Sequence, residues 1–171
     1  FSGGEPTIHP DLLEMIAAAQ QRDIKYVMVN TNGLRIANDP EWFARFAALR
    51  PLIYLQFDGL TDETYQVIRG EPLLETKLRA LDRLAEADLH VILVAALERD
   101  VNEHEAVAIV EFRLRNPAVR RVLFPPVPPS VRHPKCDPTQ RITTPHPLRA
   151  LPSPPAGPVS YPPPLPPPPR S

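Results

Sequence analysis

The feature that most constrains this chain is an alternation of short apolar segments with amphipathic segments over its first 127 residues. The apolar segments suit buried strands, and the segments between them repeat apolar residues at the spacing of a helix. The four predicted strands cover residues 25–30, 52–57, 90–97 and 119–124. Strands separated by helices are typical of repeated β–α units, so the predicted fold class is α/β, with a parallel sheet covered by helices.

The first two residues are expected to end a further strand, because Phe1-Ser2 stands directly before a glycine turn. A domain seldom starts on the turn that follows a cut strand. We therefore interpret Phe1 as a fragment boundary rather than as a biological N-terminus, and the fold as N-terminally truncated.

Proline divides the chain, since 19 of its 25 prolines lie from Pro125 onward. Proline removes a backbone donor and interrupts regular structure. We therefore predict a β–α domain at 1–127, a following segment at 128–151 that could begin one more helix, and a Pro-rich tail at 152–171. The tail is expected to be extended, disordered and without function. A proline-rich ligand and an artefact of a reading-frame shift are alternative interpretations of it.

Composition excludes several classes of function. The net charge of -1 provides no basic surface for nucleic acid. No apolar run reaches the roughly 18 residues of a membrane span and no leader opens the chain, so we expect a soluble, cytoplasmic protein without a transmembrane segment. Cys136 is the single cysteine, which excludes an internal disulfide and a multi-cysteine metal site within this chain. His133 lies near Cys136, and we interpret that pair as incidental.

Three local signals predict where helices begin. Asp39-Pro40 has the form of an N-cap followed by a first-turn proline, and Thr61 or Asp62 could cap the next helix. Asn102 and Glu105 have the spacing of a capping box, with Asn in place of Ser or Thr.

The turn Gly3-Gly4-Glu5-Pro6 lies between the cut strand and the first predicted helix. Its glycines permit positive φ angles and a close approach of the backbone to a ligand. Glu5 places an acceptor at the carboxyl end of the sheet, where parallel β–α folds have their sites. The alternative is a plain turn with an exposed glutamate, and it would be preferred for the two glycines alone.

Polar residues also follow the other predicted strands at this edge of the sheet. Asn30 and Asn32 lie at the end of one strand, Gln56 and Asp58 at the end of the next, and Asn102 after the third. Each has a structural alternative, because Asn32 begins a turn signal and both Asp58 and Asn102 could cap helices. Their common placement favours a shared binding site.

The segment Phe1-Ser-Gly-Gly-Glu-Pro-Thr7, followed by His9-Pro-Asp-Leu-Leu13, resembles the second-strand segment of the radical S-adenosylmethionine (radical SAM) superfamily. The resemblance implies a partial (β/α)6 TIM-like barrel and a Gly-Gly-Glu-Pro turn that binds the methionyl amino group of S-adenosylmethionine. It also implies a four-iron four-sulfur cluster held by a CxxxCxxC loop, which would precede Phe1.

The same resemblance extends to the other strand ends. Asn30-Thr-Asn-Gly33 is similar to the Thr-Asn-Gly after the family's third strand, and Gln56-Phe-Asp-Gly59 to the end of its fourth. Asn102 then corresponds to the exit of the fifth strand, with an adenosine or ribose contact implied. The residues assigned to the cofactor site are Gly3, Gly4, Glu5, Pro6, Asn30, Asn32, Gln56, Asp58 and Asn102, and none is assigned to catalysis or to a metal.

Residues 54–81 and Arg141–Pro145 resemble a subgroup with tetraether lipid synthases and proteins once described as pterin methyltransferases. The resemblance implies an enzyme that forms a 5′-deoxyadenosyl radical for C–H activation, leading to methylation or C–C bond formation. Its implied partners are a small-molecule or lipid substrate and a reductant such as ferredoxin or flavodoxin. The isolated chain is expected to be inactive without the cysteine loop. A truncated module that binds a nucleotide or a partner without chemistry, and an unrelated β–α barrel lyase, stay open.

Overall fold

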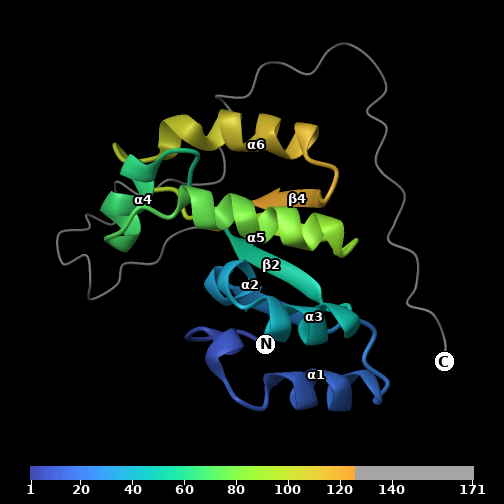
Figure 1. The fold of residues 1–171 in the computed structure, drawn as a ribbon. Coiled ribbons are helices and arrows are strands. Elements are labelled where there is room, and N and C mark those ends of the chain that lie inside the picture. The colour runs from blue at the N-terminus through green and yellow to red at the C-terminus, as the bar shows by residue number, and fades with distance from the viewer. Residues whose placement is uncertain (126–171) are drawn as a thin grey trace, which may run out of the picture.

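The computed structural model describes residues 1–125, so the predicted segments at 128–151 and 152–171 lie outside the described residues. Within 1–125, strands and helices alternate along the chain (Figure 1). The strands are β1 (Met28–Thr31), β2 (Leu52–Gln56), β3 (Val91–Val94) and β4 (Val119–Leu123). The helices are the short 3₁₀ helices η1 (Pro6–Ile8) and η2 (Glu103–Glu105), and α1 (Leu12–Gln20), α2 (Leu34–Asn38), α3 (Pro40–Ala48), α4 (Asp62–Arg69), α5 (Leu74–Glu86) and α6 (Ala106–Arg115).

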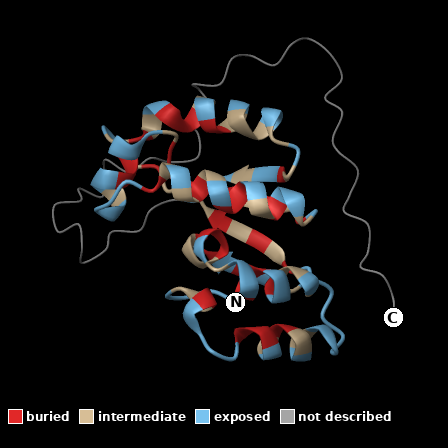
Figure 2. Ribbon diagram, viewed as in Figure 1, coloured by how far each residue is buried: buried red, intermediate tan, exposed pale blue. Residues whose placement is uncertain are grey.

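The strands of the described region form one parallel sheet in the order β1-β2-β3-β4. Because crossovers between parallel strands are almost always right-handed, consecutive neighbouring strands are expected to place their helices on the same face of the sheet. The burial pattern agrees with this placement, because buried and more exposed residues alternate along β1, β2 and β3. Figure 2 shows the alternation along β2. The predicted α/β class with a parallel sheet is confirmed, and the arrangement is consistent with part of a TIM-like fold.

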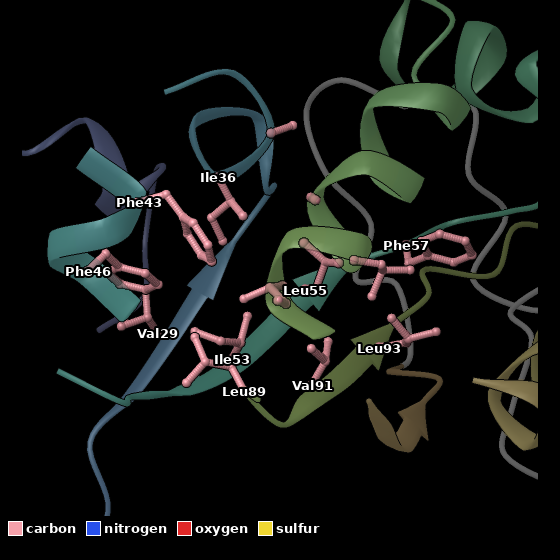
Figure 3. Packing of buried hydrophobic residues seen from close by; sticks show 14 of the residues in the cluster. Val29, Ile36, Phe43, Phe46, Ile53, Leu55, Phe57, Leu89, Val91 and Leu93 are labelled. Carbon is pink, nitrogen blue, oxygen red and sulfur yellow. The ribbon is translucent and has the colours of Figure 1, made fainter. Parts of the chain in front are cut away.

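The hydrophobic core fills the space between this sheet and the helices. Figure 3 shows side chains from both layers meeting there, among them Val29, Ile53, Leu55, Val91 and Leu93 from the strands and Ile36, Phe43 and Phe46 from the helices. Burying each such side chain contributes roughly 1.5–3 kcal/mol. The core therefore determines which face of the sheet packs against the helices, and it holds the carboxyl ends of the strands in place.

Two of the predicted helix starts are confirmed. The Asp39 carboxylate accepts a hydrogen bond of 3.0 Å from the Trp42 amide, and Pro40 occupies the first turn of α3. The Thr61 hydroxyl accepts one of 3.3 Å from the Thr64 amide and so caps α4.

The region around β1 differs from the sequence prediction. The strand predicted at 25–30 begins at Met28 and includes Thr31, and the short helix α2 was not predicted. The reason for α2 is local, because the Asn32 side-chain oxygen accepts a hydrogen bond of 2.9 Å from the Leu34 amide. An asparagine that bonds two residues ahead favours a tight turn, and here a helix follows that turn directly.

Phe1 pairs with the free edge of β1. Its amino group donates to the Met28 carbonyl at 2.6 Å, and its carbonyl accepts from the Asn30 amide at 2.9 Å. This is the hydrogen-bond pattern of a parallel pair, over a single residue. The pairing brings the glycine turn that follows Phe1 to the carboxyl end of β1.

The face of the sheet opposite the core is less covered. Asn30, Tyr54 and Ile92 are register partners and form one row across β1, β2 and β3. Gln56 and Val94 form a shorter row nearer the carboxyl ends. Because register partners in a sheet project to the same side, these side chains share one surface.

Candidate functional site

The turn before η1 has the backbone that its two glycines were expected to allow. Gly3 has a φ of 94° and Gly4 a φ of 56°, both in the region that favours glycine. An added Cβ at either position would meet no atom within 4 Å, so the turn is open on the side of these glycines. Its main-chain groups are therefore accessible to a ligand.

Glu5 holds this turn against the end of β1. Its Oε1 accepts hydrogen bonds from the Thr7 amide at 3.1 Å, the Thr7 hydroxyl at 2.6 Å and the Thr31 hydroxyl at 2.7 Å. Its Oε2 accepts one of 2.6 Å from the Asn32 amide. The plain turn with an exposed glutamate is wrong, because this carboxylate is partly buried and bonded to two segments far apart in sequence.

Asn32 and Asn30 occupy different surroundings. Asn32 reaches the Glu5 carboxylate through its backbone amide, while its side chain starts α2. The interpretation of Asn32-Gly33 as a turn is therefore confirmed alongside its placement at the strand end. Asn30 is exposed, and its side-chain amide donates to the Ser2 hydroxyl at 3.5 Å. The structure brings Asn32 to the turn through its backbone and leaves the Asn30 side chain on the open face.

Asp58 lies at the end of β2 and is fully buried. Its Oδ2 accepts a hydrogen bond of 2.9 Å from the Arg69 Nε and forms an ion pair of 2.8 Å with the Arg69 Nη2, and its Oδ1 accepts a hydrogen bond of 3.1 Å from the Ala96 amide. With the Gln56 amide oriented so that its oxygen faces Arg69, it accepts a hydrogen bond of 2.6 Å from the same guanidinium. Arg69 therefore joins the two predicted residues of this strand end, and Thr61 rather than Asp58 caps α4.

Asn102 connects the ends of β2 and β3. Its buried side-chain amide donates to the Asp58 carbonyl at 2.7 Å and to the Ala96 carbonyl at 2.9 Å, and its oxygen accepts from the Glu98 amide at 2.7 Å. These bonds bring the strand ends together at the edge that carries the Glu5 turn.

The predicted capping box of Asn102 and Glu105 is wrong, because the Asn102 side chain makes no cap hydrogen bond. The Glu105 carboxylate instead accepts from the Leu60 amide at 2.5 Å and from the Thr64 hydroxyl. The local pattern predicted that the Glu105 carboxylate would bond at the start of its own helix. In the structure it bonds to donors that are distant in sequence, in the loop after β2 and in α4.

Lys77 was not assigned to the site from the sequence. It is 0% exposed, and its Nζ donates a hydrogen bond of 2.6 Å to the Asn32 carbonyl. Burial lowers the pKa of this lysine to about 8. One sequence signal was available, because Lys77 lies three residues after Leu74 and four before Leu81, on the apolar stripe of α5.

Arg35 on α2 supports the turn from another side. Its Nη1 donates a hydrogen bond of 2.6 Å to the Thr7 carbonyl, and its guanidinium lies 4.5 Å from the ring centroid of Trp42. It also pairs with Asp39 at 3.2 Å. The segment after Glu5 is thus tied to both α2 and α3.

Tyr65 lies behind the strand ends. Its ring packs edge-on against Phe57, and the Lys77 Nζ lies 5.8 Å from its centroid. The buried hydroxyl has no hydrogen-bond partner among residues 1–125. Burial, followed by the negative charge of Asp58, raises the pKa of this phenol, so it stays neutral.

Residues 1–125 contain no group of three His, Cys, Asp or Glu side chains that could hold a metal ion. The pair His133 and Cys136 lies outside the described residues. No helix in the described part of the chain is long and apolar enough to cross a membrane.

The parallel sheet with a polar cluster at the carboxyl ends of its strands defines a β/α protein of the kind that binds ligands at that edge. The chain belongs to the radical SAM superfamily, whose family model matches residues 1–113.

Two curated relatives are similar to parts of the chain. A 7,8-dihydro-6-hydroxymethylpterin dimethyltransferase of Methanocaldococcus jannaschii is 36% identical over 129 residues, which cover 74% of this chain and 26% of the relative. Mycofactocin maturase MftC of Mycobacterium ulcerans is 39% identical over 90 residues, which cover 51% of this chain and 23% of that protein. The chain thus spans about a quarter of the length of these relatives.

Proposed function

We propose that residues 1–125 form the S-adenosylmethionine-binding part of a radical SAM enzyme. The observation that carries the proposal is the attachment of the open Gly3-Gly4 turn to the end of β1 through the carboxylate of Glu5. Membership of the radical SAM superfamily supports the same cofactor.

In this proposal the turn binds the methionyl ammonium of the cofactor. Of the two Glu5 oxygens, Oε2 accepts a single hydrogen bond from the described residues, from Asn32, and retains a lone pair for an ammonium donor. The open main chain at Gly3 and Gly4 can supply carbonyl acceptors. A hydrogen bond between charged partners is roughly twice as strong as one between neutral partners, so Glu5 contributes to both orientation and affinity.

The other strand-end residues orient the pocket in this proposal. Gln56 and Asp58 are held in place by Arg69, and Asn102 fixes the spacing between β2 and β3. Asn30 faces the open side of the sheet, where the adenosine or the substrate would lie. Precise placement of a bound reactant is the main contribution that a protein makes to cofactor chemistry.

The proposed activity of the whole enzyme is reductive formation of a 5′-deoxyadenosyl radical for C–H activation, with methylation or C–C bond formation as the outcome. Residues 1–125 do not fit the four-iron four-sulfur cluster that this activity requires, because they contain no suitable group of ligands. A small-molecule substrate is in keeping with the relative named as a pterin dimethyltransferase, and a small electron-transfer protein would supply the electron.

A second candidate is a module that binds the nucleotide cofactor without chemistry. The contacts of the open Gly3-Gly4 turn favour it, because they form without a cluster. The two candidates differ in one measurable respect. The sequence that precedes Phe1 in the whole protein separates them, because a radical SAM enzyme needs a CxxxCxxC loop there, whereas a binding module does not.

The experiment that tests the proposed site is calorimetric titration of the 171-residue chain with S-adenosylmethionine, compared among Glu5→Ala, Glu41→Ala and the unaltered chain. Glu41 is exposed on α3 and serves as the matched control. We expect Glu5→Ala to weaken binding at least about tenfold, in line with loss of a charge-assisted hydrogen bond. Unchanged affinity in Glu5→Ala would contradict the assignment of this turn.

A further inference from the structure

We infer that Lys77 is a positioning residue of the cofactor turn, acting through the backbone of Asn32. The inference rests on the proposed function only for the consequence in cofactor binding. The structural part stands on contacts among α5, the end of β1 and the turn at Glu5.

The first observation is the burial of the Lys77 ammonium. A lysine that is 0% exposed has lost its hydration, and such a group is retained only where it is hydrogen-bonded or paired. Among residues 1–125 Lys77 forms no ion pair within 4.0 Å. Its Nζ instead donates to a backbone carbonyl, that of Asn32, at 2.6 Å.

The second observation is the position of Asn32. Its carbonyl accepts from Lys77, and its amide donates to Glu5 at 2.6 Å. One residue thus connects a cation on α5 with the carboxylate that holds the turn. If the Lys77 bond is removed, the Asn32 backbone can rotate, and the donor that fixes Glu5 moves with it.

The third observation concerns electrostatics. The Glu5 and Asp58 carboxylates lie close enough to favour the charged form of Lys77, whereas Arg69 opposes it. Lys77 therefore supplies positive charge behind two carboxylates of the strand-end cluster.

The same helix contains a suitable control. The Nη1 of Arg83 donates a hydrogen bond of 3.1 Å to the Ile36 carbonyl of α2. Arg83 thus makes the same kind of contact as Lys77, from a helical cation to a backbone carbonyl, but its acceptor is on α2 and not next to Glu5. If Lys77 served only to dock α5, loss of either side chain would have the same effect.

The test compares Lys77→Met, Lys77→Arg and Arg83→Met in the 171-residue chain by amide hydrogen exchange and by titration with S-adenosylmethionine. We expect Lys77→Met to speed exchange of the Asn32 amide at least about tenfold relative to the amides of Leu55 and Leu93, with a similar loss of affinity. Lys77→Arg, which keeps a cationic donor, should restore part of the protection of the Asn32 amide and part of the affinity. Arg83→Met should leave both unchanged.

If the Asn32 amide of Lys77→Met exchanges as slowly as in the unaltered chain, the inference is overturned. It is also overturned if Arg83→Met speeds exchange of this amide and weakens cofactor binding as much as Lys77→Met does. If Lys77→Met does not fold, Lys77→Arg decides: a folded variant with an unprotected Asn32 amide would contradict the assignment. Failure of the unaltered chain to bind S-adenosylmethionine would refute the proposed function instead. The exchange data would still decide the role of Lys77, because they need no ligand.

Discussion

Glu5 Oε2 accepts a hydrogen bond of 2.6 Å from the backbone amide of Asn32, a residue that directly follows β1. This bond and that from the Thr31 hydroxyl make the glycine turn and the strand end one structural unit. Loops at the ends of strands are normally more mobile than the strands themselves. Here the first two polar segments of the candidate site are fixed relative to each other in the absence of a ligand, which would lower the entropy cost of binding one.

Gly33 is predicted to be the least replaceable glycine of the site. It has a φ of 79°, and an added Cβ would lie 2.5 Å from Leu55 Cδ1 in the core. Gly33→Ala should lower the free energy of unfolding by about 2–4 kcal/mol, from backbone strain plus the clash. Gly70→Ala is the control, because Gly70 has a φ of 86° with no atom within 4 Å, and strain alone should cost about 1–2 kcal/mol. Urea unfolding checks both, and equal losses would contradict the packing at Gly33.

The ion pair of Asp58 and Arg69 is predicted to contribute far more to the free energy of unfolding than an ion pair on the surface. Asp58→Asn removes the charge that compensates Arg69 and should cost about 2–4 kcal/mol, somewhat less than in a wholly buried pair because Arg69 is partly exposed. Glu75→Gln, which breaks the exposed pair with Arg79, should cost less than about 1 kcal/mol. Thermal or urea unfolding of the two variants gives the comparison. A small effect of Asp58→Asn would show that Asp58 does not organise this strand end.

Stability should rise with pH in the range where Lys77 titrates. Burial lowers the pKa of Lys77 from its ordinary value of 10.5 to about 8, so above pH 8 the native state binds fewer protons than the unfolded chain. The free energy of unfolding therefore increases between about pH 8 and pH 9.5. The raised pKa of Tyr65 has the opposite effect near and above pH 10, so the measurement should stop below that range.

The readout is the difference in urea stability between the unaltered chain and Lys77→Met across this range. Groups common to both proteins cancel in that difference. If this difference in stability does not change with pH, the surroundings of Lys77 do not disfavour its charged form, and the prediction is wrong.

Much of the fold could be predicted because its signals are local. Strands are indicated by apolar runs of a few consecutive residues. The helix caps at Asp39 and Thr61 depend on residues three positions apart, and both caps are present in the structure. The cap predicted from Asn102 and Glu105 failed for the opposite reason. The donors that bind Glu105, at Leu60 and Thr64, are more than forty residues away, and no local spacing indicates them.

The site was predictable in outline and not in its supporting contacts. Residues at strand ends could be placed at one edge, because parallel strands bring their carboxyl ends together. The contacts of Lys77 and Arg69 with that edge depend on how α4 and α5 pack, which the sequence pattern leaves open. A lysine on an apolar helical stripe is the one signal that could have indicated such a contact.

The measurement that tests the central claim most directly is nuclear magnetic resonance mapping of S-adenosylmethionine binding on the 171-residue chain. The account predicts saturable shifts of the amides of Gly3, Gly4, Glu5 and Asn32, with little change at Arg50 and Asp88 on the opposite edge of the sheet. S-adenosylhomocysteine, which has the same amino acid end, should shift the same turn amides. No saturable binding, or shifts centred on Arg50 and Asp88, would contradict the claim that this turn holds the cofactor.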